Sequence, residues 1–370
     1  MENRRSRTRS ARAGGGVTLQ QVAQLAGVSL ATASRVLHGS GARNVGDQLR
    51  SRVEDAARSL RYVSNAPAQA LARSSSSVVG LIVHDVADPY FGAIAAGAMQ
   101  AAREQELMVM IAATFRESGL EVQYLRSLRA QRVRAIILAG SGTTGISTGG
   151  ISTAGAGTDP VGTGEELAEE IAAFEAEGGR VVAIGERGLG LDTVAMANRS
   201  GAAGAVRALW ELGHRELGVV AGPADLTTVA HRLDGARRAL RALGAAAGTP
   251  VERSDFSQEG GRAAAVRLLR AHPGTTAVLV LSDAMAAGVL AGLQEDLGLA
   301  VPEQVSVVGF NDAPYAVNLR PALSTVRLPL ERAGQEALRL LLEPEADEPR
   351  TVELDTELVL RASTGPAPGR

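Results

Sequence analysis

Residues 17–37, VTLQQVAQLAGVSLATASRVL, predict two short helices joined by a tight turn. Thr18 and Gln21 have the spacing of a capping box, which satisfies backbone amides at the start of a helix. Gly27 supplies the positive φ angle that the turn needs, and Ser29 can cap the second helix. The side chains that we expect to face the interior are Leu19, Val22, Ala23, Leu25, Val28, Ala33, Val36 and Leu37.

The outer face of the second helix carries mostly small or hydroxylated side chains and one guanidinium, namely Leu30, Ala31, Thr32, Ser34 and Arg35. The major groove of DNA accepts such a face. An ordinary packed helical hairpin has the same spacing, so the pattern alone leaves both interpretations open. Residues 46–62 carry further apolar side chains at helical spacing and predict a third helix that closes a small core.

The stretch Tyr62-x-x-Asn65…Ala68-x-x-Leu71 follows, and together with residues 17–37 it resembles the LacI/GalR family of bacterial transcription regulators. The resemblance implies a helix-turn-helix DNA-binding head over residues 17–64. It also implies a hinge helix and linker over residues 65–77, which becomes helical only on DNA, where two Leu71 side chains wedge into a minor-groove step. The residues that we expect at the DNA are Thr18, Ser29, Leu30, Ala31, Thr32, Ser34, Arg35, His38, Asn65, Ala68 and Leu71.

The formal net charge of −2 conceals an uneven distribution, because residues 1–75 contain twelve arginines and only four acidic residues. A basic head on an acidic body fits a module that binds duplex DNA, since the head must displace counterions from phosphates. Five of these arginines lie in residues 1–16 among Ser, Gly and Ala, which cannot bury a core. We therefore expect residues 1–16 to be a disordered basic arm.

A length of 370 residues suits a short head and a larger body that is itself divided in two. No apolar run approaches the ~20 residues of a membrane span, and the N-terminal arginines lack the apolar stretch of a signal peptide. We therefore expect a cytoplasmic protein. The absence of cysteine excludes disulfides, thiolate metal sites and a cysteine nucleophile, and we expect no cofactor and no metal.

The body alternates short apolar runs with helical stretches, which predicts a doubly wound α/β architecture with the ligand at the carboxyl ends of the strands. By resemblance, residues 78–363 form a periplasmic-binding-protein-like core of two subdomains, with crossovers near 190–198 and 324–332 and a tail over 364–370. The expected strands are 78–83, 134–140, 180–185, 216–222, 276–282 and 304–310, and the expected helices include 91–105, 200–213, 232–244, 260–272 and 283–298.

Residues 141–164 form a low-complexity Gly, Thr and Ser segment where the family usually has a short loop. A phosphate-binding loop would need ordered G-x-G-x-x-G spacing or a following Gly-Lys-Ser/Thr, and neither is present. We therefore interpret the segment as a flexible surface insertion.

The resemblance also implies a set of effector-binding residues. Asp88-Pro89-Tyr90-Phe91 matches a stretch of the family whose rings can stack on a sugar face. We expect a guanidinium and a carboxylate to face each other across a cleft, which suits a polyhydroxylated ligand but also fits a structural ion pair. The expected effector-binding residues are Asp88, Tyr90, Phe91, Arg232, Phe256, Ser282, Asp283 and Asn311.

Two departures from the family pattern make the expected pocket less acidic. Asn311 and Ala197 stand where the family commonly has aspartate. An enzyme on the same α/β core is one alternative, but the five histidines show no metal spacing and no base–nucleophile pair is evident, so we expect no catalytic residues. A solute-binding protein is another alternative, and the attached head argues against it.

The predicted function is that of a transcription regulator, with a repressor as the specific expectation. By symmetry, a homodimer reads a pseudopalindromic operator with two recognition helices about one DNA turn apart. The expected effector is a small metabolite, a sugar or sugar derivative, whose binding rotates the two subdomains and releases the DNA.

Overall fold

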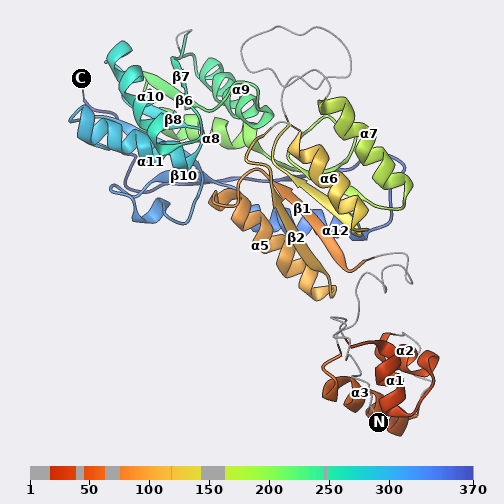
Figure 1. Ribbon diagram of the computed structural model, residues 1–370. Helices are drawn as coiled ribbons and strands as arrows, with labels where there is room; N and C mark the ends of the chain where they lie inside the picture. Colours follow the sequence, from red (N-terminus) through yellow and green to blue (C-terminus); the bar gives the residue numbers. More distant parts are fainter. Residues whose placement is uncertain are drawn as a thin grey trace, which may run out of the picture. The chain divides into compact units, whose positions relative to one another are not determined.

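The computed structural model describes residues 17–38, 46–62, 76–117, 119–142, 163–245 and 248–369. They belong to two compact units, residues 1–76 and residues 77–370, which we treat separately (Figure 1). The predicted DNA-contacting residues Asn65, Ala68 and Leu71, the arm over residues 1–16 and positions 143–162 of the predicted insertion all lie outside the described residues.

The described residues of the first unit form three helices, α1 (Leu19–Ala26), α2 (Leu30–His38) and α3 (Asp47–Ser59). The predicted capping box begins α1: the Thr18 amide donates to Oε1 of Gln21 (2.8 Å), and the Gln21 amide donates to the Thr18 hydroxyl (3.4 Å). Gly27 ends the helix with φ of 63°, and the Thr32 amide donates to the Ser29 hydroxyl (3.1 Å) at the start of α2.

A small core joins these helices, and Val22, Ala26 and Val53 are among its buried members. The expectation that Leu25 faces the interior is wrong, because its side chain is 57% exposed. A helix turns by about 100° per residue, and Leu25 therefore falls about 110° from the middle of the buried face. Ala26 takes the interior position instead.

The described residues of the second unit form two six-stranded sheets with helices on them, which we call the first and second lobes (Figure 1). The first sheet is parallel, in the order β11-β5-β4-β3-β1-β2. Its strands are β1 (Val78–Val83), β2 (Met108–Ala113), β3 (Ala135–Ala139), β4 (Val181–Ile184), β5 (Asp192–Met196) and β11 (Thr351–Leu354). Its helices are α5 (Pro89–Glu104), α6 (Leu120–Ala130), α7 (Thr163–Ala176) and α12 (Leu330–Leu342).

Two apolar layers enclose the first sheet, because successive side chains of a strand point to opposite faces. Leu81 belongs to the layer that α5 and α12 cover, and Ile82 belongs to the layer that α6 and α7 cover. Gly97 lets α5 and α12 approach closely, since a Cβ there would lie 1.8 Å from the Glu331 carbonyl oxygen.

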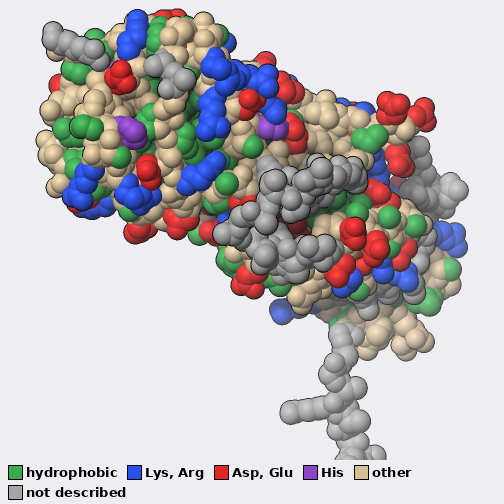
Figure 2. Space-filling model, turned by 90° about the horizontal axis from the view of Figure 1, so that it is seen from above, with side chains coloured by type: hydrophobic (Ala, Val, Ile, Leu, Met, Phe, Trp, Pro, Cys, Tyr) green, Lys and Arg blue, Asp and Glu red, His purple; other side chains and the backbone are tan. Residues whose placement is uncertain are grey.

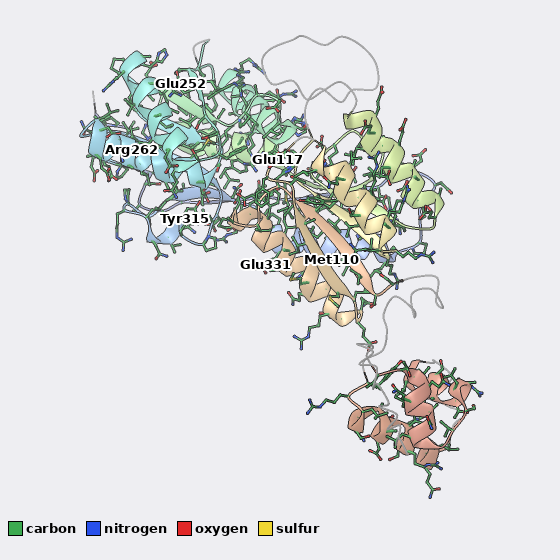
Figure 3. All side chains as sticks on the ribbon, in the orientation of Figure 1. Met110, Glu117, Glu252, Arg262, Tyr315 and Glu331 are labelled. Atoms are coloured by element: carbon green, nitrogen blue, oxygen red, sulfur yellow. The ribbon has the colours of Figure 1, made fainter. Side chains whose placement is uncertain are left out.

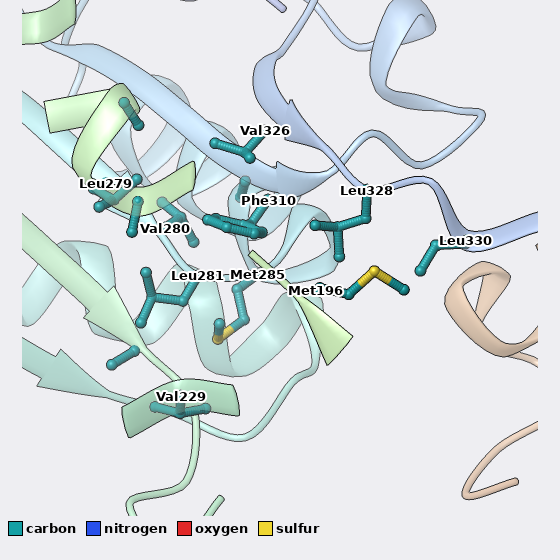
Figure 4. Close-up of a cluster of buried hydrophobic side chains, with 14 of the residues drawn as sticks. Met196, Val229, Leu279, Val280, Leu281, Met285, Phe310, Val326, Leu328 and Leu330 are labelled. Atoms are coloured by element: carbon teal, nitrogen blue, oxygen red, sulfur yellow. The ribbon is translucent and has the colours of Figure 1, made fainter. Parts of the chain in front are cut away.

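The second sheet has the order β12-β10-β9-β8-β6-β7, with β12 antiparallel to β10 and the other pairs parallel. Phe310 lies in its apolar core, surrounded by side chains from several elements (Figure 4). The strands are β6 (Leu217–Ala221), β7 (Val251–Arg253), β8 (Ala277–Val280), β9 (Ser306–Asn311), β10 (Ser324–Arg327) and β12 (Glu357–Val359). The helices α8 (Asn198–Glu211) and α9 (Thr227–Ala242) pack together, as do α10 (Gln258–Ala271) and α11 (Asp283–Ala291).

The chain passes between the two lobes three times. It crosses at residue 197 between β5 and α8, at 328–329 between β10 and α12, and at 355–356 between β11 and β12. The first two crossings fall in the ranges 190–198 and 324–332, whereas the sequence did not indicate the third. No helix among the described residues is long and apolar enough to span a membrane.

Candidate DNA interface and ligand cleft

The predicted DNA-facing side chains of α2 are at the surface of the first unit. Leu30 is 52% exposed, Ala31 and Arg35 are exposed, and Ser34 is half-buried. The Arg35 guanidinium has no ion-pair partner among the described residues, so it is available to a base or a phosphate. His38 is the last residue of α2.

Three other predicted DNA contacts are engaged in helix caps. Thr18 bonds Gln21 at the start of α1, and the Ser29 and Thr32 hydroxyls bond each other at 2.8 Å at the start of α2. Their caps fix the two helices that present the outer face. Capping hydroxyls and amides at a helix start are also groups that contact DNA phosphates.

Two cavities lie between the lobes of the second unit, at the carboxyl ends of the parallel strands. The first cavity has a volume of about 230 Å³ and the second about 340 Å³. Glu117 lines the first cavity, and Tyr315 and Glu331 line the second (Figure 3). Arginine and acidic side chains are interspersed over the face of the protein that Figure 2 shows.

The second cavity brings together four of the eight predicted effector residues, Asp88, Tyr90, Ser282 and Asn311. Asp88 caps α5 by accepting the Tyr90 amide at 2.9 Å, and its partial burial raises the pKa of its carboxyl. Ser282 caps α11. Asn311 has φ of 120°, and its buried Oδ1 has no hydrogen-bond partner among the described residues. Asn311 therefore carries a buried, unpaired acceptor next to this cavity.

Arg232 and Asp283 are both buried and both belong to the second lobe, on α9 and α11, so the expectation that they face each other across the cleft is wrong. Arg232 donates to Oδ1 of Asn198 (2.8 Å) and to the Leu281 carbonyl (2.7 Å). Burial lowers the pKa of Arg232 to about 10. Asp283 likewise accepts its hydrogen bonds from groups of its own lobe.

The two phenylalanines of the predicted site occupy different surroundings. Phe91 is buried in the core, edge-on to Tyr90 and His84, rather than exposed as a stacking wall for a ligand. Phe91 lies on the buried face of α5, so its ring points toward the interior. Phe256 is half-buried, and the Arg116 guanidinium lies 5.1 Å from the centre of its ring.

The first cavity is lined by residues that the sequence analysis did not single out. They follow β1, β2, β3 and β4 in the first lobe and β6 in the second, and they include His84, Thr114, Arg116, Glu121, Arg187 and Asp225. Arg187 donates twice to Glu121 (3.0 and 2.9 Å) and once to the Gly140 carbonyl (2.9 Å). Burial acts to raise the pKa of Glu121, but Arg187 holds it below its usual value.

Matches to known families follow the same division of the chain. Residues 18–65 match the model described as "Bacterial regulatory proteins, lacI family". Residues 76–148 match "Periplasmic binding proteins and sugar binding domain of LacI family", and residues 206–364 match "Periplasmic binding protein-like domain". The HTH-type transcriptional regulator GalS of Salmonella typhimurium is 33% identical over 334 residues, which cover 88% of this chain and 89% of GalS.

The chain belongs to the lacI family of bacterial regulatory proteins. It is a transcriptional regulator with a DNA-binding helix-turn-helix head. Two solved structures of lacI-family proteins share its fold over almost the whole chain. The CelR–cellobiose complex has 30% identity and a TM-score of 0.67, and the match covers 94% of this chain and 99% of CelR. The lac repressor dimer bound to operator and the anti-inducer ONPF has 25% identity and a TM-score of 0.80, and the match covers 95% and 100%.

Proposed function

We propose that this lacI-family regulator is a repressor that binds a pseudopalindromic operator as a homodimer, and that a sugar or sugar derivative in the cleft controls it. The exposed face of α2, with Arg35 available, carries the DNA-binding half of the proposal. The two cavities between lobes of one chain support the ligand half. The CelR complex with cellobiose and the operator-bound lac repressor dimer are the relatives that support both halves.

Exposed methionines support the homodimer. Met99 on α5 and Met108 and Met110 on β2 are all exposed, Met108 to 65%, and α5 packs on β2. Met110 projects from the edge strand β2 (Figure 3). Apolar side chains that gather on a surface mark interaction sites, and a two-fold axis lets one patch meet its own copy.

Release of the DNA would follow from rotation of the two lobes about their three crossings. A ligand shifts this equilibrium only if it contacts one arrangement of the lobes better than the other. Both cavities have walls from both lobes, so a bound sugar would meet this condition. We propose that the regulator acts in the cytoplasm, where operator DNA is available, and that it binds its ligand without converting it.

Selection of binding sites from random DNA tests the proposal, followed by sedimentation of the purified complex. We expect enriched sequences with two-fold symmetry, bound by two chains per site. Addition of neutral and acidic sugars to that complex then identifies a ligand by release of the DNA. Enrichment of asymmetric sites bound by a single chain would contradict the dimer, and enrichment of no sequence would contradict operator recognition.

A further inference from the structure

The turn after β2 places Arg116 at the first cavity by a backbone conformation that residues other than glycine rarely adopt. Phe115 and Arg116 have φ angles of 50° and 61°, two successive non-glycine residues in the left-handed region. Burial of Phe115 does not offset this strain, because its side chain is 62% exposed. Strain of this kind gathers at functional sites, where the surrounding structure holds it. In this turn the strained backbone places the Arg116 guanidinium at the first cavity.

The Arg116 guanidinium lies beside Phe256 of the second lobe and has no carboxylate within ion-pair distance among the described residues. Arg187 lines the same cavity, and its charge is matched by two bonds to Glu121. The Arg116 side chain is exposed, and the carboxylates of Asp88, Asp225 and Asp85 act on it at longer range; desolvation by the surrounding chain outweighs them and lowers its pKa. Arg116 therefore brings to the cavity a guanidinium that is in ion-pair contact with no carboxylate of the described residues.

His84 also lines this cavity. Its Nδ1 bonds the Thr114 hydroxyl at 3.2 Å, and its buried Nε2 has no hydrogen-bond partner in the described part of the chain. Burial lowers the pKa of His84 to about 4, so the ring is neutral near pH 7. When the Thr114 hydroxyl donates to Nδ1, Nε2 carries the proton and is a donor.

The acidic groups that line the first cavity differ in their surroundings. Glu121 is held by Arg187, and Glu117 and Asp225 are exposed to water. Of the two arginines that line the cavity, Arg187 is paired with Glu121, and Arg116 is the one that no carboxylate of the described residues contacts. The cavity volume of about 230 Å³ lies below the roughly 300–1,000 Å³ of sites for drug-sized ligands, so it suits one small ring.

We propose that Arg116 selects an effector that carries a carboxylate or phosphate on a single sugar unit. The guanidinium forms two parallel bonds to the oxyanion, a geometry that an arginine fork matches well. Phe256 offers its ring to the apolar face of the sugar, and contact with both lobes favours one arrangement of them. This inference rests on the proposed function, because it takes the cleft between the lobes as the effector site.

Thermal unfolding at constant ionic strength tests the inference, with D-glucose and D-galactose as neutral probes. D-Glucuronate and D-galacturonate test the carboxylate, and D-glucose 6-phosphate tests the phosphate. We expect at least one acidic probe to raise the unfolding temperature where its neutral counterpart does not. Calorimetry should then show that Arg116→Gln lowers the affinity for that probe at least tenfold, while Arg116→Lys recovers part of the lost affinity. Arg207→Gln, an exposed position on α8 outside both cavities, is the matched control.

Operator binding by the same preparations shows that each variant is folded and separates the two proposals. Three results would overturn the role of Arg116. Only a neutral sugar stabilises the protein, or no acidic probe stabilises it, or an acidic probe stabilises wild type and Arg116→Gln equally. If a neutral sugar releases the operator from wild type and from Arg116→Gln alike, the sugar-controlled function stands and this inference fails. If no probe changes operator binding, the ligand half of the proposed function fails with it.

Discussion

Replacement of Asp283 separates the hydrogen bonds of a buried carboxylate from its charge. Oδ2 of Asp283 accepts the Ala313 amide at 2.7 Å, and Oδ1 accepts the Thr325 hydroxyl at 2.7 Å. Asp283→Ala removes both bonds and leaves a buried donor at each end. A hydrogen bond to a charged group contributes about 1.5–3 kcal/mol, so loss of the two bonds should lower the free energy of unfolding by about 3–6 kcal/mol.

Asp283→Asn is the matched control. Its side-chain oxygen can still accept the Ala313 amide, and its nitrogen can donate to the Thr325 hydroxyl, so we expect stability within about 1 kcal/mol of wild type. Burial raises the pKa of Asp283 above the ordinary value of 3.8. The folded wild type therefore loses stability from this group as the pH rises through that raised pKa, and the Asp283→Asn variant does not, because its amide does not titrate.

Urea denaturation of the purified protein at about pH 4 and about pH 7 measures these differences. The stability of Asp283→Asn relative to wild type should increase between the two pH values. The reasoning fails if Asp283→Asn loses as much stability as Asp283→Ala at both pH values, since the charge rather than the bonds would then be essential. It also fails if Asp283→Ala stays within about 1 kcal/mol of wild type.

Two further substitutions test the DNA interface and the packing of the first lobe. Arg35→Ala should reduce the free-energy preference for operator over random DNA by about 1–3 kcal/mol, as anisotropy titrations would measure. Arg58→Ala on α3 removes the same charge and should keep the ratio of the two affinities. An unchanged ratio in Arg35→Ala would place recognition elsewhere. Gly97→Ala should lower the free energy of unfolding by about 1–3 kcal/mol, because its Cβ would collide with the Glu331 carbonyl. Gly92→Ala on the same helix meets no atom within 4 Å and should be neutral or stabilising, so equal losses in both variants would contradict the packing argument.

The sequence predicts six of the eight interior strands, and it misses the interior strands β5 and β10 and the four edge strands. The run at 78–83 coincides with β1, and five other apolar runs contain or overlap β3, β4, β6, β8 and β9. These strands are buried on both faces, which produces continuous apolar runs. The edge strands β7, β11 and β12 and the interior strands β5 and β10 mix polar and apolar residues and give a weaker signal, whereas the edge strand β2 is a continuous apolar run, MVMIAA, that the sequence prediction missed.

The candidate site is only partly accessible to sequence reasoning. Asp88, Tyr90, Ser282 and Asn311 lie in recognisable stretches, and the structure places them around one cavity. The relation between Arg232 and Asp283 needed the fold, because a motif gives no information on which lobe a helix belongs to. Arg116 carries no sequence signal at all: its position depends on two left-handed backbone angles and on a ring 140 residues further along the chain.

The third crossing between the lobes has a consequence for synthesis of the chain. The first sheet receives β11 and its apolar face receives α12 only after the whole of α8 through β10 has been made. The α5 side of that lobe thus stays open to water while the second lobe is translated, and neither lobe is a continuous segment that can be expressed alone. If translation stops before residue 330, the second lobe is nearly complete, but the first lobe lacks α12, the helix that covers its apolar face. The last forty residues therefore close both halves of the body, and truncation there removes the ligand cleft together with the fold.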